Sequence, residues 1–144
     1  MKTRVSGIII LGFAALALLA GEAAAQRIVY VADIPFSFTV NDVTLPPGKY
    51  EISQRLQIGD SWDFLLMDAK GAVKVIFGTE SAERMSRQPN AELSFDEIGG
   101  RYFLSQLWLA DTTDGFYVPK SREERALMKD GARPKKSGVN LTKK

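Results

Sequence analysis

The chain has 144 residues, of which 45% are hydrophobic and 25% charged, and its formal net charge at pH 7 is +2. This composition is typical of one globular domain and excludes a repeat array or a disordered protein. The sequence contains neither cysteine nor histidine, which excludes disulfides, cysteine nucleophiles, serine–histidine–aspartate triads and imidazole metal ligands.

The first 25 residues have the three parts of a secretory signal peptide. Lys2 and Arg4 give a positive start, residues 5–21 carry no charge, and Ala23-Ala24-Ala25 offers small residues to a signal peptidase. The uncharged stretch is shorter than the roughly 20 residues that a membrane-spanning helix needs. We therefore expect cleavage after Ala25, export to the periplasm or the exterior, and no transmembrane span afterwards.

The exported part opens with a predicted strand. Over residues 28–40, apolar side chains occupy the even positions and polar side chains or Pro35 most of the odd ones. Such alternation is typical of a strand with one buried face. Because Pro35 cannot donate to a sheet ladder, the strand should lie at an edge or bend there. Turns are predicted at 41–42 and 45–48.

Further strands follow at short intervals. Residues 49–58 should form a strand that buries Tyr50, Ile52, Leu56 and Ile58. Residues 62–68 and 73–77 should form a hairpin around Lys70-Gly71.

The apolar pattern lapses over 79–90, which predicts an exposed connection. It resumes at 91–95 and continues over 101–110, where both faces are apolar and a central strand is expected. A loop over 111–115 and a short strand over 116–118 complete the series.

A short helix is predicted over 121–129. Ser121 and Glu124 form an S-x-x-E capping box, and Gly131 ends the helix. Residues 26–128 hold 11 basic and 15 acidic residues, whereas six basic residues and one acidic residue follow from Lys129 onward. The tail, 130–144, lacks a core-forming pattern and is predicted to be disordered.

Together these elements predict a single all-β domain over 26–128 with six or seven antiparallel strands and one short C-terminal helix. No connection is long enough for a crossover helix, which disfavours a parallel sheet. A β-sandwich and a small barrel both fit the pattern.

Four motifs of this domain occur in the same order in an uncharacterised family of small secreted β-proteins of soil bacteria, which the chain resembles. The family pattern is PFxF, LPxGxY, YFLxxxW and PKSxxER, and the corresponding segments here are IPFSFTV (34–40), LPPGKYEI (45–52), RYFLSQLW (101–108) and PKSREER (119–125). The resemblance implies an envelope or extracellular β-domain of a diderm bacterium and supplies no functional residues. Turn chemistry alone accounts for the LPPGKY segment.

A catalytic role finds little support in the sequence. Without histidine, acid–base chemistry would fall to carboxylates. Asp96 and Glu97 should point to opposite faces of a strand, so they cannot act together. Asp111 and Asp114 lack the alternate-residue acidic pattern of a calcium loop. We predict no catalytic residue, no metal ligand and no cofactor.

Two groups of residues are candidates for binding. Trp62, Trp108 and Tyr117 could contact a ligand or a partner, although the apolar surroundings of both tryptophans favour the core. Basic residues of the tail could attract polyanions without specificity for nucleic acid, although a solubilising tail is the favoured interpretation. These residues are Lys135, Lys136, Lys143 and Lys144.

Three functions stay open. The leading hypothesis is an exported, non-catalytic module that binds an unknown partner in the envelope or outside the cell. The alternatives are a lipocalin-like carrier of a small apolar ligand and a carboxylate-dependent hydrolase. An internal cavity on the order of a few hundred Å³ would favour the carrier, and a filled interior with an exposed apolar patch would favour the interaction module. A cleft with two carboxylates about 5–10 Å apart would favour the hydrolase.

Overall fold

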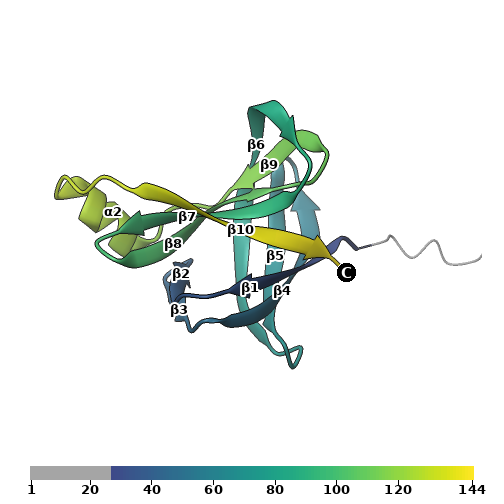
Figure 1. Cartoon of the computed structure of the whole chain (residues 1–144), viewed down its shortest axis with the longest axis horizontal. Helices are drawn as coiled ribbons and strands as arrows, with labels where there is room; N and C mark the ends of the chain where they lie inside the picture. Colours follow the sequence, from purple (N-terminus) through teal and green to yellow (C-terminus); the bar gives the residue numbers. More distant parts are fainter. Residues whose placement is uncertain (1–26) are drawn as a thin grey trace, which may run out of the picture.

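The computed structural model describes residues 27–144, and the predicted signal peptide lies outside them. The described residues form ten strands and one helix (Figure 1). The helix, α2, precedes the last strand in the chain. The elements are β1 (Val29–Ile34), β2 (Phe38–Val40), β3 (Val43–Leu45), β4 (Gly48–Ile58), β5 (Ser61–Asp68), β6 (Val73–Gln88), β7 (Ala91–Ile98), β8 (Arg101–Trp108), β9 (Thr112–Tyr117), α2 (Arg122–Lys129) and β10 (Lys135–Lys143).

Eight of the strands close into an antiparallel barrel. Their order around the barrel is β1, β4, β5, β6, β9, β8, β7 and β10, and β10 pairs with β1 to complete the ring. Closure gives every strand of the ring a partner strand on both sides. The predicted all-β antiparallel fold is therefore confirmed. Of the two architectures left open the chain adopts the barrel, with more strands than the six or seven expected.

The remaining two strands, β2 and β3, form a hairpin at one end of the barrel. The last residues of β8, from Gln106 to Trp108, pair with β9. Its first residues, Tyr102 and Phe103, pair instead with β2 in parallel. The hairpin thus occupies the part of the β8 edge that β9 leaves free.

The alternation over 28–40 describes two strands separated by a bend. β1 ends at Ile34, directly before Pro35, and β2 starts at Phe38. β1 pairs on both sides, with β4 and β10, so it is not an edge strand. Even-numbered side chains are buried or half-buried throughout, as predicted. Pro35 therefore marks a bend.

A β-bulge overturns the predicted buried face of β4. Gln54 pairs with Phe64 and Leu56 with Asp63, which leaves one residue of β4 extra. An extra residue in one strand moves each side chain beyond it to the opposite face of the sheet. Leu56 and Ile58 are consequently 49% and 67% exposed, contrary to expectation.

The predicted exposed connection over 79–90 is wrong in its conformation. β6 continues to Gln88 and pairs with β9, although Ala82 is its only buried residue after Thr79. Backbone hydrogen bonds hold this segment, so it needs no apolar alternation. Most of the predicted loop over 111–115 likewise belongs to β9.

The predicted disordered tail is also wrong, because Lys135–Lys143 forms β10 between β7 and β1. Leu141 is buried, and Val139 packs against the core. Two lysines of this segment form ion pairs within the chain: Lys136 Nζ lies 2.5 Å from the Asp96 carboxylate, and Lys144 Nζ lies 2.5 Å from the Glu51 carboxylate. The segment can form a strand with few apolar residues, because β7 and β1 pair with its backbone N–H and C=O groups on both sides.

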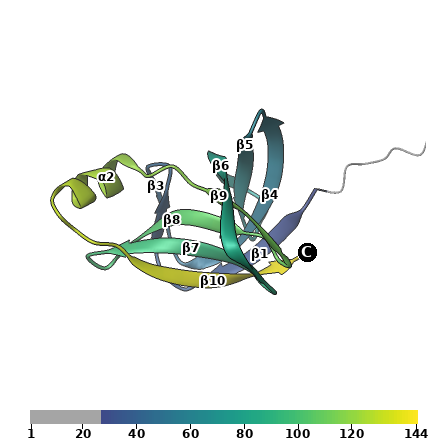
Figure 2. The ribbon, with the colours of Figure 1, turned by 90° about the horizontal axis from the view of Figure 1, so that it is seen from above.

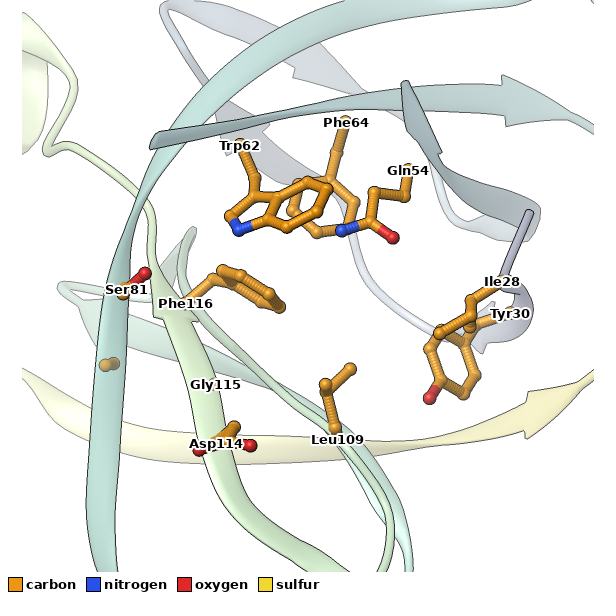
Figure 3. A pocket seen from close by; sticks show the side chains of 11 residues that line it. Ile28, Tyr30, Gln54, Trp62, Phe64, Ser81, Leu109, Asp114, Gly115 and Phe116 are labelled. Atoms are coloured by element: carbon orange, nitrogen blue, oxygen red, sulfur yellow. The ribbon is translucent and has the colours of Figure 1, made fainter. Parts of the chain in front are cut away.

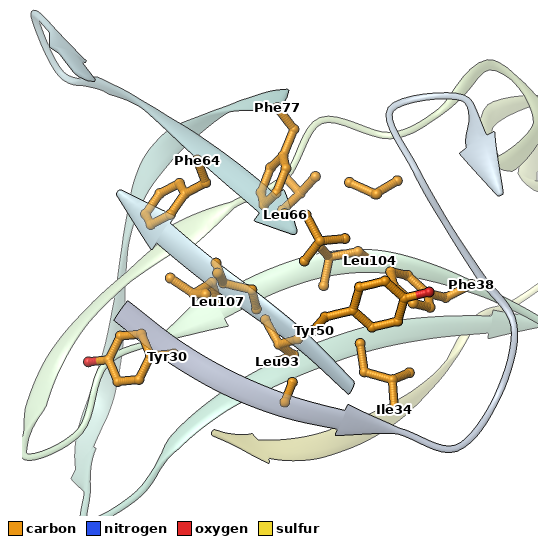
Figure 4. Packing of buried hydrophobic residues seen from close by; sticks show 14 of the residues in the cluster. Tyr30, Ile34, Phe38, Tyr50, Phe64, Leu66, Phe77, Leu93, Leu104 and Leu107 are labelled. Carbon is orange, nitrogen blue, oxygen red and sulfur yellow. The ribbon is translucent and has the colours of Figure 1, made fainter. Parts of the chain in front are cut away.

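Aromatic side chains fill the barrel at the end near the β2–β3 hairpin (Figure 4). Phe38 contacts Tyr50 and Phe95 edge-on at ring-centre distances of 5.4 and 5.6 Å. Phe36 stacks on Tyr102 at 3.8 Å. The Tyr50 hydroxyl donates a 2.7 Å hydrogen bond to the Pro46 carbonyl. The LPPGKY segment therefore has a structural role at the filled end.

Removing residues 135–144 should unfold the barrel, because it exposes the backbone groups of β1 and β7 and the interior beneath Leu141. We expect a loss of roughly 5 kcal/mol or more, comparable to the whole stability of a domain. Circular dichroism during urea unfolding measures this loss. The substitution Lys144→Ala, which removes one ion pair and keeps the strand, is the control. A truncated chain that unfolds cooperatively at the original urea concentration would contradict the role of β10.

Candidate ligand-binding site

The barrel interior is hollow at the end opposite the β2–β3 hairpin. A cavity of about 300 Å³ lies there among the start of β1, the middle of β4, the start of β5, the later part of β6, and β9 (Figure 3). Its lining is mainly apolar. The lining residues are Ile28, Tyr30, Gln54, Trp62, Phe64, Ser81, Ala82, Leu109, Asp114, Gly115 and Phe116.

Three aromatic side chains form one wall of this cavity. Phe116 lies edge-on to Phe64 at 5.1 Å and to Trp62 at 6.4 Å between ring centres. Phe64 stacks in turn on Phe77, at 5.8 Å, in the packed interior. The wall is therefore continuous with the packed core.

Polar groups are few in the lining. The Gln54 amide points into the cavity and the Tyr30 hydroxyl points away from the packed cluster (Figures 3 and 4). Tyr30 is 7% exposed, and burial raises the pKa of its hydroxyl. Within residues 27–144, neither group has a hydrogen-bond partner. Asp114 adds a carboxylate, which accepts a 2.9 Å hydrogen bond from Thr112 Oγ1.

A second hollow adjoins the first. It shares Ile28, Tyr30 and Leu109 with the cavity and extends toward Asp111 and Lys143. The open end therefore widens toward β10 and the turn before β9.

The three predicted contact residues do not come together. Trp62 lines the cavity, whereas Trp108 and Tyr117 lie on the outer face of the barrel with ring centres 6.4 Å apart. Trp108 is buried as predicted, but on the outside, where its ring covers Gly115 and leaves no room for a β-carbon there. The Arg84 guanidinium covers the same ring at 4.9 Å.

Most of the lining residues carry no signal of a cavity in the sequence, although one residue does. Gln54 is the single polar residue in the apolar series 50, 52, 54, 56 and 58 of the predicted strand. A polar side chain at an inward position needs a partner or a cavity. Tyr30 and Phe116 carried no such signal, because an aromatic residue at an inward position fits the core equally well.

The predicted polyanion contacts are partly engaged within the chain. Lys136 and Lys144 form the ion pairs of β10 with Asp96 and Glu51, which leaves Lys135 and Lys143 as exposed tail cations without an ion pair in the described chain. No basic surface of the kind that binds polyanions is assembled by these four residues.

A buried polar cluster attaches α2 and β10 to β7. Asp96 and Glu124 are each 1% exposed, and Lys120 lies 2.9 and 2.8 Å from their carboxylates. The Ser121 hydroxyl accepts a 3.1 Å hydrogen bond from the Glu124 N–H, so the predicted cap is present. Glu124 itself turns inward to Lys120 instead of completing the capping box. Arg101 and Glu123 form an outer ion pair over the same helix.

The pKa values of the two buried carboxyl groups shift in opposite directions. Burial alone would raise the pKa of Asp96, but hydrogen bonds from Lys136 and Lys120 outweigh it and lower the pKa. Burial raises the pKa of Glu124, and the adjacent Asp96 carboxylate adds to the rise, against the opposing effect of Lys120. Neither group lines any of the cavities described above.

Residues 27–144 contain no group of three or more acidic side chains placed to hold a metal ion. In the same part of the chain, no helix combines the length and the apolar character needed to cross a membrane.

No family model matches the chain, and neither a curated protein nor a solved structure shows significant similarity to it. The resemblance to secreted β-proteins of soil bacteria therefore stays a prediction, and function is inferred from the geometry of the chain itself.

The buried carboxyl pair predicts a pH-dependent stability. Because folding raises the pKa of Glu124, its contribution is complete at low pH and is lost as pH rises through the folded value. For Asp96, whose pKa is lowered, the contribution is present above the unfolded pKa and is lost on acidification. Glu124→Gln should abolish the loss on the alkaline side, whereas Asp96→Asn should destabilise the chain by about 3 kcal/mol.

Urea unfolding between about pH 3 and pH 9, spanning the ordinary carboxyl range on both sides, measures these effects. Glu123→Gln, which changes the exposed neighbouring carboxylate, is the control. The interpretation fails if Glu124→Gln and the unaltered chain lose stability equally as pH rises.

Proposed function

We propose that this chain binds a small, mostly apolar molecule in the open end of its barrel. The observation that carries the proposal is the cavity of about 300 Å³ beside the Trp62–Phe64–Phe116 wall. This volume is at the lower end of the range of small-molecule sites, about 300–1,000 Å³. An eight-stranded barrel is just wide enough either to be filled by side chains or to hold one small ligand.

The asymmetry of the interior supports a binding role. One end is filled by Phe36, Phe38 and Tyr50, whereas the other keeps its hollow although each strand around it has a partner on both sides. An unfilled apolar hollow sacrifices dispersion contacts and stability. A ligand in that space would restore the contacts. This reasoning favours the carrier over a purely structural interaction module.

The predicted export is compatible with a carrier, because a barrel without disulfides folds equally well outside the cytoplasm. We therefore place the proposed binding in the periplasm or the exterior. The hydrolase alternative gains no support, since Asp96 and Glu124 are paired with lysines and line no described cavity.

Filling the cavity should abolish binding without unfolding the chain. Leu109 points into the cavity (Figure 3), so Leu109→Trp places an indole in the ligand space. The neutral fluorescent probe N-phenyl-1-naphthylamine should bind the unaltered chain with micromolar affinity and the variant at least about tenfold more weakly, the effect of losing roughly 1.4 kcal/mol.

The control is Ile76→Trp, which adds the same indole at a 43% exposed position of β6 outside the cavity lining. Probe binding should be unchanged in this variant, and circular dichroism should show both variants folded. A probe that binds the unaltered chain and the folded Leu109→Trp variant equally well would contradict the proposed site.

A further inference from the structure

The side chains that line the cavity include an acidic residue but no basic one. Its lining contains one carboxylate, Asp114, and no lysine or arginine. An apolar pocket for a fatty acid or another anion needs a cation or a cluster of donors to stabilise the ligand charge. This cavity offers the opposite charge.

A second carboxylate stands next to the first. Glu83 of β6 pairs with Asp114 of β9 across the ladder. Directly paired residues project from the same face of a sheet, and like charges in such a pair destabilise it. In the described chain neither carboxylate has an ion-pair partner. The rim therefore carries two adjacent negative charges that the protein does not neutralise.

The tyrosine at the cavity also points to a ligand. Tyr30 is 7% exposed, yet within residues 27–144 its hydroxyl has no hydrogen-bond partner and faces the hollow rather than the packed core. The hydroxyl oxygen itself is not among the fully buried polar atoms of the described chain, so it opens on the cavity and can donate a hydrogen bond to a molecule there. A ligand or water in the cavity would complete this bond.

The aromatic wall supplies the remaining element. Trp62, Phe64 and Phe116 meet at the cavity, and the faces of aromatic rings carry negative potential that attracts cations, most strongly when the cation is desolvated. Aromatic rings together with rim carboxylates form a suitable environment for a cation that carries its own apolar substituents.

We infer that the cavity takes a small organic ammonium ion: an amine or quaternary ammonium with an aromatic or short aliphatic substituent. This inference rests on the proposed function and names its ligand class. The apolar substituent occupies the hollow beside Phe116, and the cationic group lies between the aromatic wall and the pair formed by Glu83 and Asp114. Carboxylates and other anions are rejected by the same pair.

The adjoining hollow does not reverse this preference. It contains Lys143, but Asp111 lines the same hollow and offsets that charge. The lysine of the adjoining hollow is thus on the side of β10, and neither lysine nor arginine lines the cavity with the aromatic wall.

Three probes of similar shape test the inference by displacement of N-phenyl-1-naphthylamine from the purified chain. Benzyltrimethylammonium is the cation, neopentylbenzene is its neutral isostere, and 3-phenylpropanoate is the anion. We expect the cation to bind about tenfold more tightly than the neutral isostere, and the anion to bind more weakly than both. High salt should weaken the cation alone, because rim charges are screened.

The double variant Glu83→Gln/Asp114→Asn should reduce cation binding about fivefold and leave the neutral isostere unchanged, as expected for partly exposed charges. The control is Glu80→Gln, which removes a carboxylate from the same strand where it pairs with Tyr117 on the outer face. This control should not alter the affinity for the cation.

The outcomes separate the two proposals. Tighter binding of the cation that is lost in the double variant supports the ammonium site. Equal binding of cation and neutral isostere, or tighter binding of the anion, overturns the ammonium site while the binding barrel stands. If none of the three compounds and no neutral probe binds, the proposed function itself is overturned.

Discussion

Every other feature of the fold depends on pairing the edges of β1 and β7. An eight-stranded antiparallel sheet that stops one strand short would leave two rows of backbone donors and acceptors open to water and to other chains. β10 fills this gap, with seven residue pairs to β7, from Lys135 to Leu141, and three to β1. The cavity, the core and the docking of α2 all require a closed wall, so the last residues of the chain complete the structure that the first strands begin (Figure 2).

The two ends of the barrel differ because each contains a different local irregularity, a bend at Pro35 at one end and a bulge after Gln54 at the other. At one end the bend at Pro35 directs the β2–β3 hairpin along β8 and brings Phe36 and Phe38 over the interior. At the other end the bulge after Gln54 turns Leu56 and Ile58 outward, which removes two large side chains from the space they would otherwise fill. The hollow therefore follows from the register between β4 and β5. The one extra residue of β4 turns Leu56 and Ile58 outward, so they do not fill the interior.

Charge is organised at two levels. The acidic excess of the domain and the basic excess of the tail meet within the molecule, at Asp96 with Lys136 and at Glu51 with Lys144. Around Asp96 this pairing is buried, and such pairs contribute more to a specific arrangement than to net stability. At the mouth of the barrel Glu83 and Asp114 pair across β6 and β9, and in the described chain neither forms an ion pair.

The sequence alone determined the all-β antiparallel class, the alternation of β1 and β2, the β5–β6 hairpin and the Ser121 cap, because each follows from side-chain periodicity or turn chemistry within a few residues. Nothing local distinguished β10 from a solvated tail or the second half of β6 from a loop, since both are held by backbone bonds to distant strands. The cavity was likewise decided only by tertiary structure: whether Tyr30, Trp62 and Phe116 pack together or line a hollow depends on which strands are neighbours and on a one-residue register shift. Periodicity fixes which side chains point inward, and only the closed barrel fixes how much space is left between them.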